Sequence, residues 1–476
     1  MNSTFFATFW SVLDRVGAQV VSFFIGIVLA RLLSPEDFGL VGISMIFIAI
    51  ANVFIESGVS NALIRKIDRT NVDLSTAFYF NLIMGILMFC ILYVSAPLIA
   101  NYFDSDQLIG LVRVVSILVL SNSLCIVQNA ILTAELRIKI QTIINLSSLI
   151  PSGAIGIYLA INGYGVYSLG VQAVLYSIIK TIALWIVARW RPLQVFSKQS
   201  MLYLWNFGSK LIAANLLGTL FNELYTIIIG KFIGKGDLGY YSKARSLANQ
   251  PDAICCGVIQ KITIPIFSNY QYDYRLLLEK YRQAIKMIYL IMGLVTAVLL
   301  SIASPLIVLL WTDKWMGSVF PFQMLLIASL FSPASTLNLS LLQVINHTGY
   351  SLKLELIKKP IFLILILVGS YFELPGLLYA QIVISVLAVV VNMKATQKYL
   401  SYNYSQQFCD VIFYILAVAI ASSLGYFSLR ISSSIMIQLP VAVITTFIAY
   451  ISFLAMTKEQ MLVVGYNKVR KYFDKQ

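Results

Sequence analysis

The chain has 476 residues, of which 59% are hydrophobic and 11% are charged, and its mean hydropathy is +0.85. A water-soluble domain of this length has no core large enough to hide so much apolar surface, so the composition indicates a multi-pass membrane protein. The formal net charge of +14 does not indicate nucleic-acid binding, because the cations lie in short loops between hydrophobic runs, as expected from the positive-inside rule.

Hydropathy predicts fourteen spans, since a helix needs about 20 apolar residues to cross a bilayer. Six lie in the first half of the chain, at residues 8–33, 38–62, 74–100, 108–134, 140–161 and 163–188. Eight lie in the second half, at 203–233, 237–264, 284–311, 318–345, 354–372, 375–395, 408–430 and 434–456. A twelve-helix alternative omits the last pair. The predicted fold class is an all-α polytopic transmembrane bundle.

One pattern occurs twice, 200 positions apart. Arg31-Leu32-Leu33 is followed by a turn and by Asp37-Phe38-Gly39. Lys231-Phe232-Ile233 is followed by a Gly-Lys-Gly turn and by Asp237-Leu238-Gly239. Internal repeats of hydropathy and polar residues are typical of transporter folds, so the repeat predicts two pseudo-symmetric lobes around a central cavity.

The domain prediction follows from the repeat and from the loops. The stretch 191–202, with the preceding Arg189, combines a proline and several cations and is predicted to link the lobes. The predicted divisions are an N-terminal lobe at 1–190, this cytoplasmic linker, a C-terminal lobe at 203–400, an additional helix pair at 401–460 and a basic cytoplasmic tail at 461–476. Cations gather in alternate loops, which predicts that both termini are cytoplasmic.

Ionisable side chains inside predicted spans mark functional paths, because each costs at least about 2.5 kcal/mol there unless it faces water or a partner. Lys180, Lys210 and Arg245 are predicted to line the central cleft, where their excess over acids suits an anion. The alternative is intramembrane ion pairing, for example Glu223 with Lys210 or Glu56 with Arg31.

The sequence contains no motif of an enzyme. Walker A, HExxH and GxSxG patterns are absent, and the loops between spans are too short to hold an active site. The five cysteines have no CxxC spacing and His347 is the only histidine, so no metal or other cofactor is predicted.

Several motifs together resemble the Wzx-type polysaccharide flippases, in particular the branch that includes colanic acid exporters. They are ARLLSPEDFGLVG from Ala30, ESGVSNALIRK from Glu56, DLSTAFYFN from Asp73, RWRPL from Arg189, FGSKL from Phe207 and GYYSKARSLANQP from Gly239. The resemblance runs from about Phe9 to at least His347. That family belongs to the multidrug/oligosaccharidyl-lipid/polysaccharide exporter superfamily.

The resemblance implies translocation of an undecaprenyl-pyrophosphate-linked oligosaccharide across the bacterial inner membrane, for surface polysaccharide synthesis. Cations matching the family's cavity would bind the pyrophosphate; the candidates are Arg15, Arg31, Lys180, Lys210 and Arg245. The candidates for ion coupling are Glu56, Glu223 and Asp252. Tyr225, Tyr240 and Tyr241 are candidates for stacking on sugars, with interfacial belt tyrosines as the alternative. Polymerase and chain-length proteins are candidate partners.

Three other functions compete with this interpretation. A multidrug or cation antiporter of the same fold prefers an acidic cavity, which the excess of cations in these spans opposes. A membrane glycan polymerase or transferase needs a large periplasmic loop, which the sequence lacks. A scaffold in an envelope-assembly complex predicts that neutralising the intramembrane cations leaves function intact.

Overall fold

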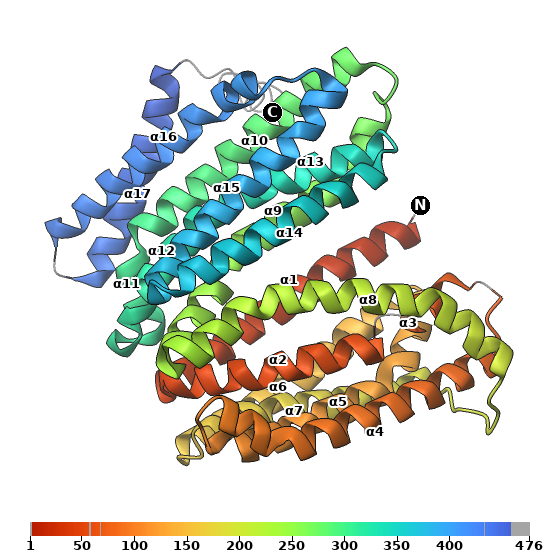
Figure 1. Cartoon of the computed structure of the whole chain (residues 1–476). Coiled ribbons are helices and arrows are strands. Elements are labelled where there is room, and N and C mark those ends of the chain that lie inside the picture. Colours follow the sequence, from red (N-terminus) through yellow and green to blue (C-terminus); the bar gives the residue numbers. More distant parts are fainter. Residues whose placement is uncertain (1, 57–58, 67, 433, 458–476) are drawn as a thin grey trace. The chain divides into compact units, whose positions relative to one another are not determined.

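The computed structural model describes residues 2–56, 59–66, 68–432 and 434–457, without the side chains of 2–16, 59, 61, 65, 207, 210, 348 and 352. Every regular element in these ranges is a helix, and the all-α prediction is confirmed. The chain divides into two compact units, Met1–Ser242 and Lys243–Gln476, and each unit is a bundle of long helices (Figure 1).

The first unit is built from eight α-helices, a π-helical turn and the first residues of α9. They are α1 (Asn2–Leu32), α2 (Pro35–Glu56), α3 (Val59–Arg65), α4 (Asn71–Tyr102), α5 (Gln107–Ala134), α6 (Ile138–Ile161), α7 (Val166–Ala188), α8 (Lys198–Ile228), η1 (Ile229–Ile233) and α9 (Lys235–Ser268). Within this unit α1 packs on α6, α4 on α5, and α7 on both α5 and α6.

The second unit contains the remainder of α9 and the rest of the chain. Its elements are α10 (Tyr274–Ser301), α11 (Ala303–Trp311), η2 (Asp313–Ser318), α12 (Val319–Ser329), α13 (Ser332–Val344), α14 (Thr348–Ser370), α15 (Glu373–Leu400), α16 (Tyr404–Ser428), η3 (Leu429–Ile431) and α17 (Ile435–Met456). Here α16 packs on α10 and α17, and α15 packs on α12, α13 and α14.

Each of the fourteen predicted spans coincides with one helix or with two consecutive helices. Eleven helical segments of the described chain are long and apolar enough to cross a membrane. The described apolar part of α1, Gly17–Leu32, is shorter, and neither α9 nor α14 meets the same criteria. Polar and charged residues of the GYYSKARSLANQP stretch lie within α9 and lower its hydropathy. The protein is a multi-pass membrane protein, as the composition predicted.

Local sequence explains where two of the first unit's helices begin. Before α2, the Asp37 carboxylate accepts hydrogen bonds from the Ser34 backbone N–H (2.9 Å) and hydroxyl (2.7 Å), and Pro35 supplies the first helical residue. Before α4, Thr70 and Asp73 form the same reciprocal capping box, and Lys66 Nζ lies 2.8 Å from the Asp73 carboxylate. These caps satisfy backbone N–H groups that have no partner within the helix.

The predicted linker between lobes packs within the first unit. The backbone N–H of Leu193 donates to the Ser75 hydroxyl (2.9 Å), and that of Ser197 donates to the Thr76 hydroxyl (3.1 Å), so the linker is attached to α4. The following helix, α8, packs against α2, α3 and α4. By packing, the division between the units falls later, inside α9 after Ser242. The assignment of 191–202 as the cytoplasmic linker between the lobes stays a prediction.

The two copies of the repeated pattern contact each other through their glycines. A Cβ atom added at Gly39 would lie 1.9 Å from the Lys235 carbonyl oxygen, and one added at Gly239 would lie 1.8 Å from the Pro35 carbonyl oxygen. Gly39 and Gly239 are equivalent in the repeat, and so are Pro35 and Lys235, so the contact is reciprocal, as at a two-fold axis. The start of α2 and the start of α9 therefore cross with their backbones in contact.

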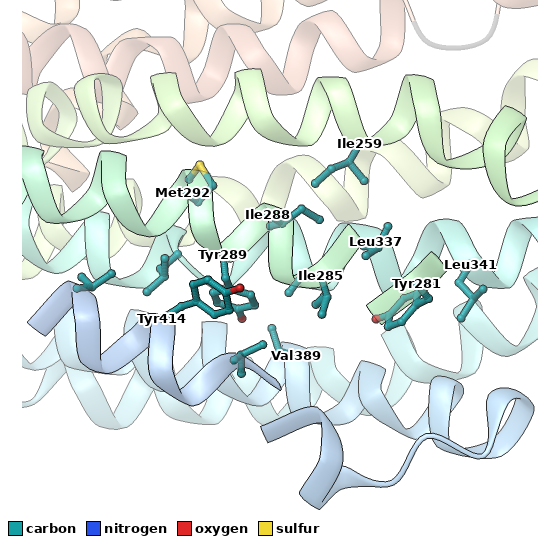
Figure 2. Close-up of a cluster of buried hydrophobic side chains, with 14 of the residues drawn as sticks. Ile259, Tyr281, Ile285, Ile288, Tyr289, Met292, Leu337, Leu341, Val389 and Tyr414 are labelled. Atoms are coloured by element: carbon teal, nitrogen blue, oxygen red, sulfur yellow. The ribbon is translucent and has the colours of Figure 1, made fainter. Parts of the chain in front are cut away.

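The second unit has a hydrophobic core that includes several tyrosines, and Figure 2 shows part of it. Its tyrosines use their polar ends within the core: the Tyr281 hydroxyl donates to Asn338 Oδ1 (2.9 Å), and the Tyr450 hydroxyl lies 3.1 Å from the Tyr289 carbonyl oxygen. Buried hydroxyls need such partners, since an unsatisfied one costs about 1–3 kcal/mol. These bonds connect α10 to α13 and α17.

An ion pair connects α10 and α16 in the same unit. The Arg282 guanidinium donates twice to the Asp410 carboxylate, at 2.6 and 2.9 Å, and Lys286 Nζ lies 3.4 Å from the same group. The Tyr402 hydroxyl also donates to Asp410. Tyr402 lies in the loop before α16, where burial, first, and the Asp410 carboxylate, second, raise its pKa well above the ordinary value. The contacts with Arg282, Lys286 and Tyr402 thus give the Asp410 carboxylate a structural role in joining α10 to α16.

We expect substitution of either crossing glycine to destabilise the first unit. In Gly39→Ala or Gly239→Ala the new methyl group overlaps a backbone carbonyl that cannot rotate away, and overpacking of this kind costs about 1–3 kcal/mol or more. Thermal unfolding in detergent, followed by size exclusion, measures the loss. Gly42→Ala is the matched control, because its nearest neighbour is the Ser242 hydroxyl at an unstrained 3.4 Å. Equal midpoints for Gly39→Ala and Gly42→Ala would contradict the tight crossing.

Candidate functional site

A cavity of about 960 Å³ lies within the first unit. Its wall is formed by residues of α2, α5, α7 and α8, together with Ser60 of α3. Much of this wall is polar, although the surrounding helices are apolar over most of their length. The polar lining residues are Asn52, Glu56, Ser60, Asn122, Asn129, Tyr176, Ser177, Lys180, Asn215, Thr219 and Asn222.

Helical spacing explains why these side chains point the same way. Asn52 and Glu56 are four residues apart on α2, and Ser177 and Lys180 are three apart on α7. On α8 the residues 215, 219 and 222 follow the same three-to-four spacing. Side chains at these intervals lie on one face of a helix. Each helix therefore turns a polar stripe toward the cavity.

Hydrogen bonds hold three helices together along one side of the cavity. Asn122 Nδ2 donates to Asn52 Oδ1 (3.2 Å), and the Ser177 hydroxyl donates to Asn122 Oδ1 (2.8 Å). This chain runs from α2 through α5 to α7 and positions both the carboxylate and the ammonium that lie one turn further on. Bonds between polar side chains within a membrane bundle are worth about 0.6–2 kcal/mol each.

The cavity contains one anionic and one cationic side chain among its described lining residues, Glu56 and Lys180. The Lys180 ammonium lies 5.8 Å from the centre of the Tyr176 ring and interacts electrostatically with the Glu56 carboxylate. Charges in a poorly solvated site attract each other more strongly than in water. The electrostatic partner of Glu56 is thus Lys180, whereas the ion-pairing alternative drawn from the sequence paired it with Arg31.

These groups suit a ligand that carries both negative charge and hydroxyl groups. The ammonium forms charge-assisted hydrogen bonds with phosphate or carboxylate oxygens. Carboxamides both donate and accept, so five asparagines match many hydroxyls without favouring one sign of charge. The described lining offers no group of three or more metal ligands.

The structure places the other predicted residues of the first unit outside this cavity or leaves them outside the described side chains. Arg31 is exposed at the end of α1. Glu223, one residue beyond the cavity, accepts a hydrogen bond from the Thr226 hydroxyl at 3.0 Å. The side chains of Arg15 and Lys210 are not among those described. Their predicted role in anion binding stays a prediction.

The tyrosines predicted to stack on sugars pack with each other. The Tyr225 and Tyr241 rings are buried and stacked, with centroids 6.1 Å apart and planes 14° apart. Tyr240 is half-buried beside them in sequence. This packing accounts for the pair without a bound sugar, and stacking on sugars stays a prediction.

Two predicted residues belong to the second unit. Arg245 is half-buried on α9. Asp252, on the same helix, accepts hydrogen bonds from the Ser332 hydroxyl (3.2 Å) and the Cys256 thiol (3.4 Å). A cleft between the lobes that contains these residues together with Lys180 stays a prediction, as does the coupling role of Asp252.

Sequence reasoning found the two charged residues of the cavity and missed its asparagines. A charge inside a span is conspicuous, whereas a single asparagine is not. The signal that was available is periodicity: Asn215, Thr219 and Asn222 repeat at helical intervals within an otherwise apolar run. Hydrogen bonding between Asn52 and Asn122 joins residues seventy positions apart and had no such signal.

Membrane-spanning helices around a polar cavity are the architecture of a membrane transporter. A family model described as "Polysaccharide biosynthesis protein" matches residues 28–320, more than half of the chain. The chain therefore belongs to this polysaccharide biosynthesis family, the family of Wzx-type flippases, as its motifs had indicated.

Curated relatives are consistent with this family. The chain is 28% identical to the teichuronic acid biosynthesis protein TuaB of Bacillus subtilis, over 56% of each chain. It is 24% identical to the succinoglycan biosynthesis transport protein ExoT of Rhizobium meliloti, over 64% of this chain and 62% of ExoT. It is 22% identical to the lipopolysaccharide biosynthesis protein WzxC of Escherichia coli, over 77% and 76%. The matches thus span a little over half of the first two relatives.

Solved structures show the same fold. A structure of the lipid II flippase MurJ matches 96% of this chain, and all of that chain, with a TM-score of 0.76 and 14% identity. An inward-facing MATE multidrug transporter matches 80% of this chain and 94% of its own, with a TM-score of 0.58 and 16% identity. At such identities the likeness establishes the fold alone. It does not separate polysaccharide transport from drug transport.

We expect the cavity to be filled with water. In a variant without its five cysteines, Asn222→Cys should react with a water-soluble thiol reagent within minutes. Val94→Cys should stay unreacted, because Val94 is 75% exposed on the apolar surface of α4, where lipid covers it. Mass spectrometry of the intact protein measures the modification. Equal reaction of the two cysteines would mean that the cavity and the outer surface do not differ in water access.

Proposed function

We propose that this protein moves a polyprenyl-pyrophosphate-linked oligosaccharide from the cytoplasmic to the periplasmic leaflet for surface polysaccharide synthesis. The family supplies the polysaccharide context, and the cavity of the first unit is the observation that supports a substrate with a charged linkage and a glycan. A volume of about 960 Å³ is ample for the pyrophosphate and the first sugars. The rest of the glycan and the lipid would lie outside it.

In this proposal the pyrophosphate binds Lys180, and the asparagines bind the phosphate oxygens and the sugar hydroxyls. The pyrophosphate would bind the Lys180 ammonium more strongly than the Glu56 carboxylate does, because it carries more negative charge and more oxygens. The hydrocarbon chain stays in the bilayer. Rocking of the lobes would expose the cavity to each side of the membrane in turn. Arg15, Arg31, Lys210 and Arg245 remain candidates for further contacts along the path.

Glu56 is the first candidate for ion coupling, because it shares the cavity with the proposed substrate-binding lysine. When phosphate takes Lys180, the carboxylate loses its cationic neighbour inside the membrane, where an unpaired charge is unfavourable. Uptake of a proton or a monovalent cation by Glu56 would neutralise this carboxylate. Substrate binding and ion binding would in this way be linked at one site. Glu223 and Asp252 are the other candidates.

The proposed location is the bacterial inner membrane, with both termini in the cytoplasm, as the cations of alternate loops predict. Enzymes that assemble the lipid-linked glycan would supply the substrate from the cytoplasmic side. A polysaccharide polymerase and chain-length proteins are the proposed consumers on the other side.

Removal of the Lys180 charge tests the proposal. In a strain that depends on this protein, Lys180→Ala should lower surface polysaccharide at least about tenfold, because a charge-assisted contact worth about 1.4 kcal/mol or more is lost. Lipid-linked precursor should accumulate at the same time. Lys180→Arg keeps the charge and should retain most transport. Lys198→Ala, at an exposed lysine of the same unit, is the control.

Protein levels must match among these variants, since only then does a change in polysaccharide report transport. Normal polysaccharide with Lys180→Ala would overturn the proposed substrate site. A loss of polysaccharide without precursor accumulation would place the defect in synthesis, and that result also contradicts a flippase.

Glu56→Gln tests the coupling step separately. If Glu56 carries the coupled ion, this variant should bind substrate but lose the dependence of transport on an imposed ion gradient, because glutamine cannot exchange a proton or cation. Transport of a fluorescent lipid-linked oligosaccharide into proteoliposomes, with and without a gradient, measures this. An unchanged response to the gradient would assign coupling to another residue.

A further inference from the structure

The first unit has a second concave site, on a different face of α2. A groove of about 310 Å³ is lined by Ile46, Phe47 and Ile50 of α2, by Leu98, Ile99 and Tyr102 of α4 with the following Phe103, and by Ile227 of α8. Apart from the Tyr102 hydroxyl, these side chains are hydrocarbon. The polar cavity is lined by Met45, Ala49, Asn52, Val53 and Glu56, which lie on another face of the same helix.

Two lysines lie at the end of this groove. The Lys231 ammonium is 5.1 Å from the centre of the Tyr102 ring, whose side chain lines the groove. The same ammonium pairs with the Asp104 carboxylate at 2.8 Å. Lys235 Nζ donates to the Asp104 backbone carbonyl, also at 2.8 Å. Two cations therefore converge on one loop beside the apolar groove.

The two ammonium groups share this end of the groove with acidic residues: Asp104 pairs with Lys231, and Asp106 follows in the same loop. The Lys231 hydrogen bond, with its charge, holds the pKa of Asp104 below the ordinary value, so that this carboxylate is ionised at neutral pH. Asp104 thus contacts both ammonium groups, Lys231 through its carboxylate and Lys235 through its backbone carbonyl. The Asp104 side chain is 76% exposed, so it can turn away when a stronger anion takes its place. An apolar groove that ends at two lysines is complementary to a lipid with a phosphorylated head: the groove suits the hydrocarbon chain and the lysines suit the phosphate.

We propose that this groove binds the polyprenyl chain of a polyprenyl pyrophosphate, with the diphosphate on Lys231 and Lys235. The inference rests on the proposed function, and it adds a lipid site separate from the cavity. A diphosphate carries at least two negative charges and spans two cations, whereas a phospholipid phosphodiester carries one. The pairing of two ammonium groups at one end favours the diphosphate.

In the orientation that the cations of the loops predict, this end of the groove lies on the periplasmic side. The site would then hold the lipid after translocation, before release into the outer leaflet. Because α2 lines the cavity with one face and the groove with another, the lipid would pass from one face of this helix to the other when it leaves the cavity.

Binding to the purified protein in phosphatidylcholine nanodiscs tests the site. The probe is farnesyl pyrophosphate, and all measurements use a Lys180→Ala background, which removes the cation of the cavity. Lys231→Ala combined with Lys235→Ala should weaken binding about tenfold or more. The matched control is Lys139→Ala combined with Lys198→Ala, two exposed lysines of the same unit, which should change binding less than about twofold.

The groove is tested by filling it. Ile50→Trp should weaken farnesyl pyrophosphate about tenfold and leave inorganic pyrophosphate unchanged, because the indole occupies the space of the chain and not that of the head. Equal binding by the double-lysine variant and its control would overturn the site. Competition by phosphatidylglycerol as strong as that by farnesyl pyrophosphate would also overturn it, since the groove would then select anionic lipids in general.

These outcomes are separable from those of the proposed function. If the groove binds the probe as expected while Lys180→Ala cells make normal polysaccharide, the lipid site stands and the cavity proposal fails. If Lys180→Ala abolishes transport while the groove variants bind the probe normally, the cavity proposal stands and the groove proposal fails.

Discussion

The contact between Gly39 and Gly239 is the constraint on which the rest of the first unit depends. Backbone against backbone is the closest approach that two helices can make, and only residues without a side chain allow it. Gly39 faces the carbonyl of Lys235, and Gly239 faces the carbonyl of Pro35, the equivalent residue of the other copy. The contact therefore fixes both the distance and the rotation of α2 relative to the start of α9. With its rotation fixed, α2 turns Asn52 and Glu56 toward one space and Ile46 and Ile50 toward another.

The cavity and the groove are thus two consequences of one fixed helix. In the membrane a polar face must find water or partners, and the asparagine and serine hydrogen bonds supply partners along one wall. Glu56 and Lys180 balance each other in the empty cavity. A site that is neutral when empty becomes negatively charged when it gains an anion, and in the proposed mechanism uptake of cations or protons offsets that charge. In the proposed mechanism, substrate binding and ion coupling therefore depend on the same pair of charges.

Much of the fold could be predicted from the sequence, because hydropathy is a local property. All fourteen predicted spans correspond to helices, and the polar character of α9 was visible in its composition. The repeat was visible too, since its residues recur in order. What could not be predicted was that its two copies contact each other, or that α8 packs with the helices before it. Both depend on packing between segments distant in the chain.

The candidate site, like the fold, could be predicted only in part. Lys180 and Glu56 were identifiable because charges are rare and unfavourable in spans. The cavity that they share and the amide network around them could not be identified, because both depend on how three helices are oriented about their own axes. The packing of Tyr225 against Tyr241 could not be predicted either. Their types suited sugar stacking, and the structure packs their rings against each other.

The central claim is that the anionic linkage of the substrate binds in the cavity of the first unit. Its most direct test is a structure, by cryo-electron microscopy in nanodiscs, of the protein with a polyprenyl-pyrophosphate-linked oligosaccharide bound. The account predicts phosphate density within about 3 Å of Lys180 Nζ, with sugar density against the asparagines of α5 and α8. Phosphate density that lies only outside this cavity, with Lys180 still facing Glu56, would contradict it.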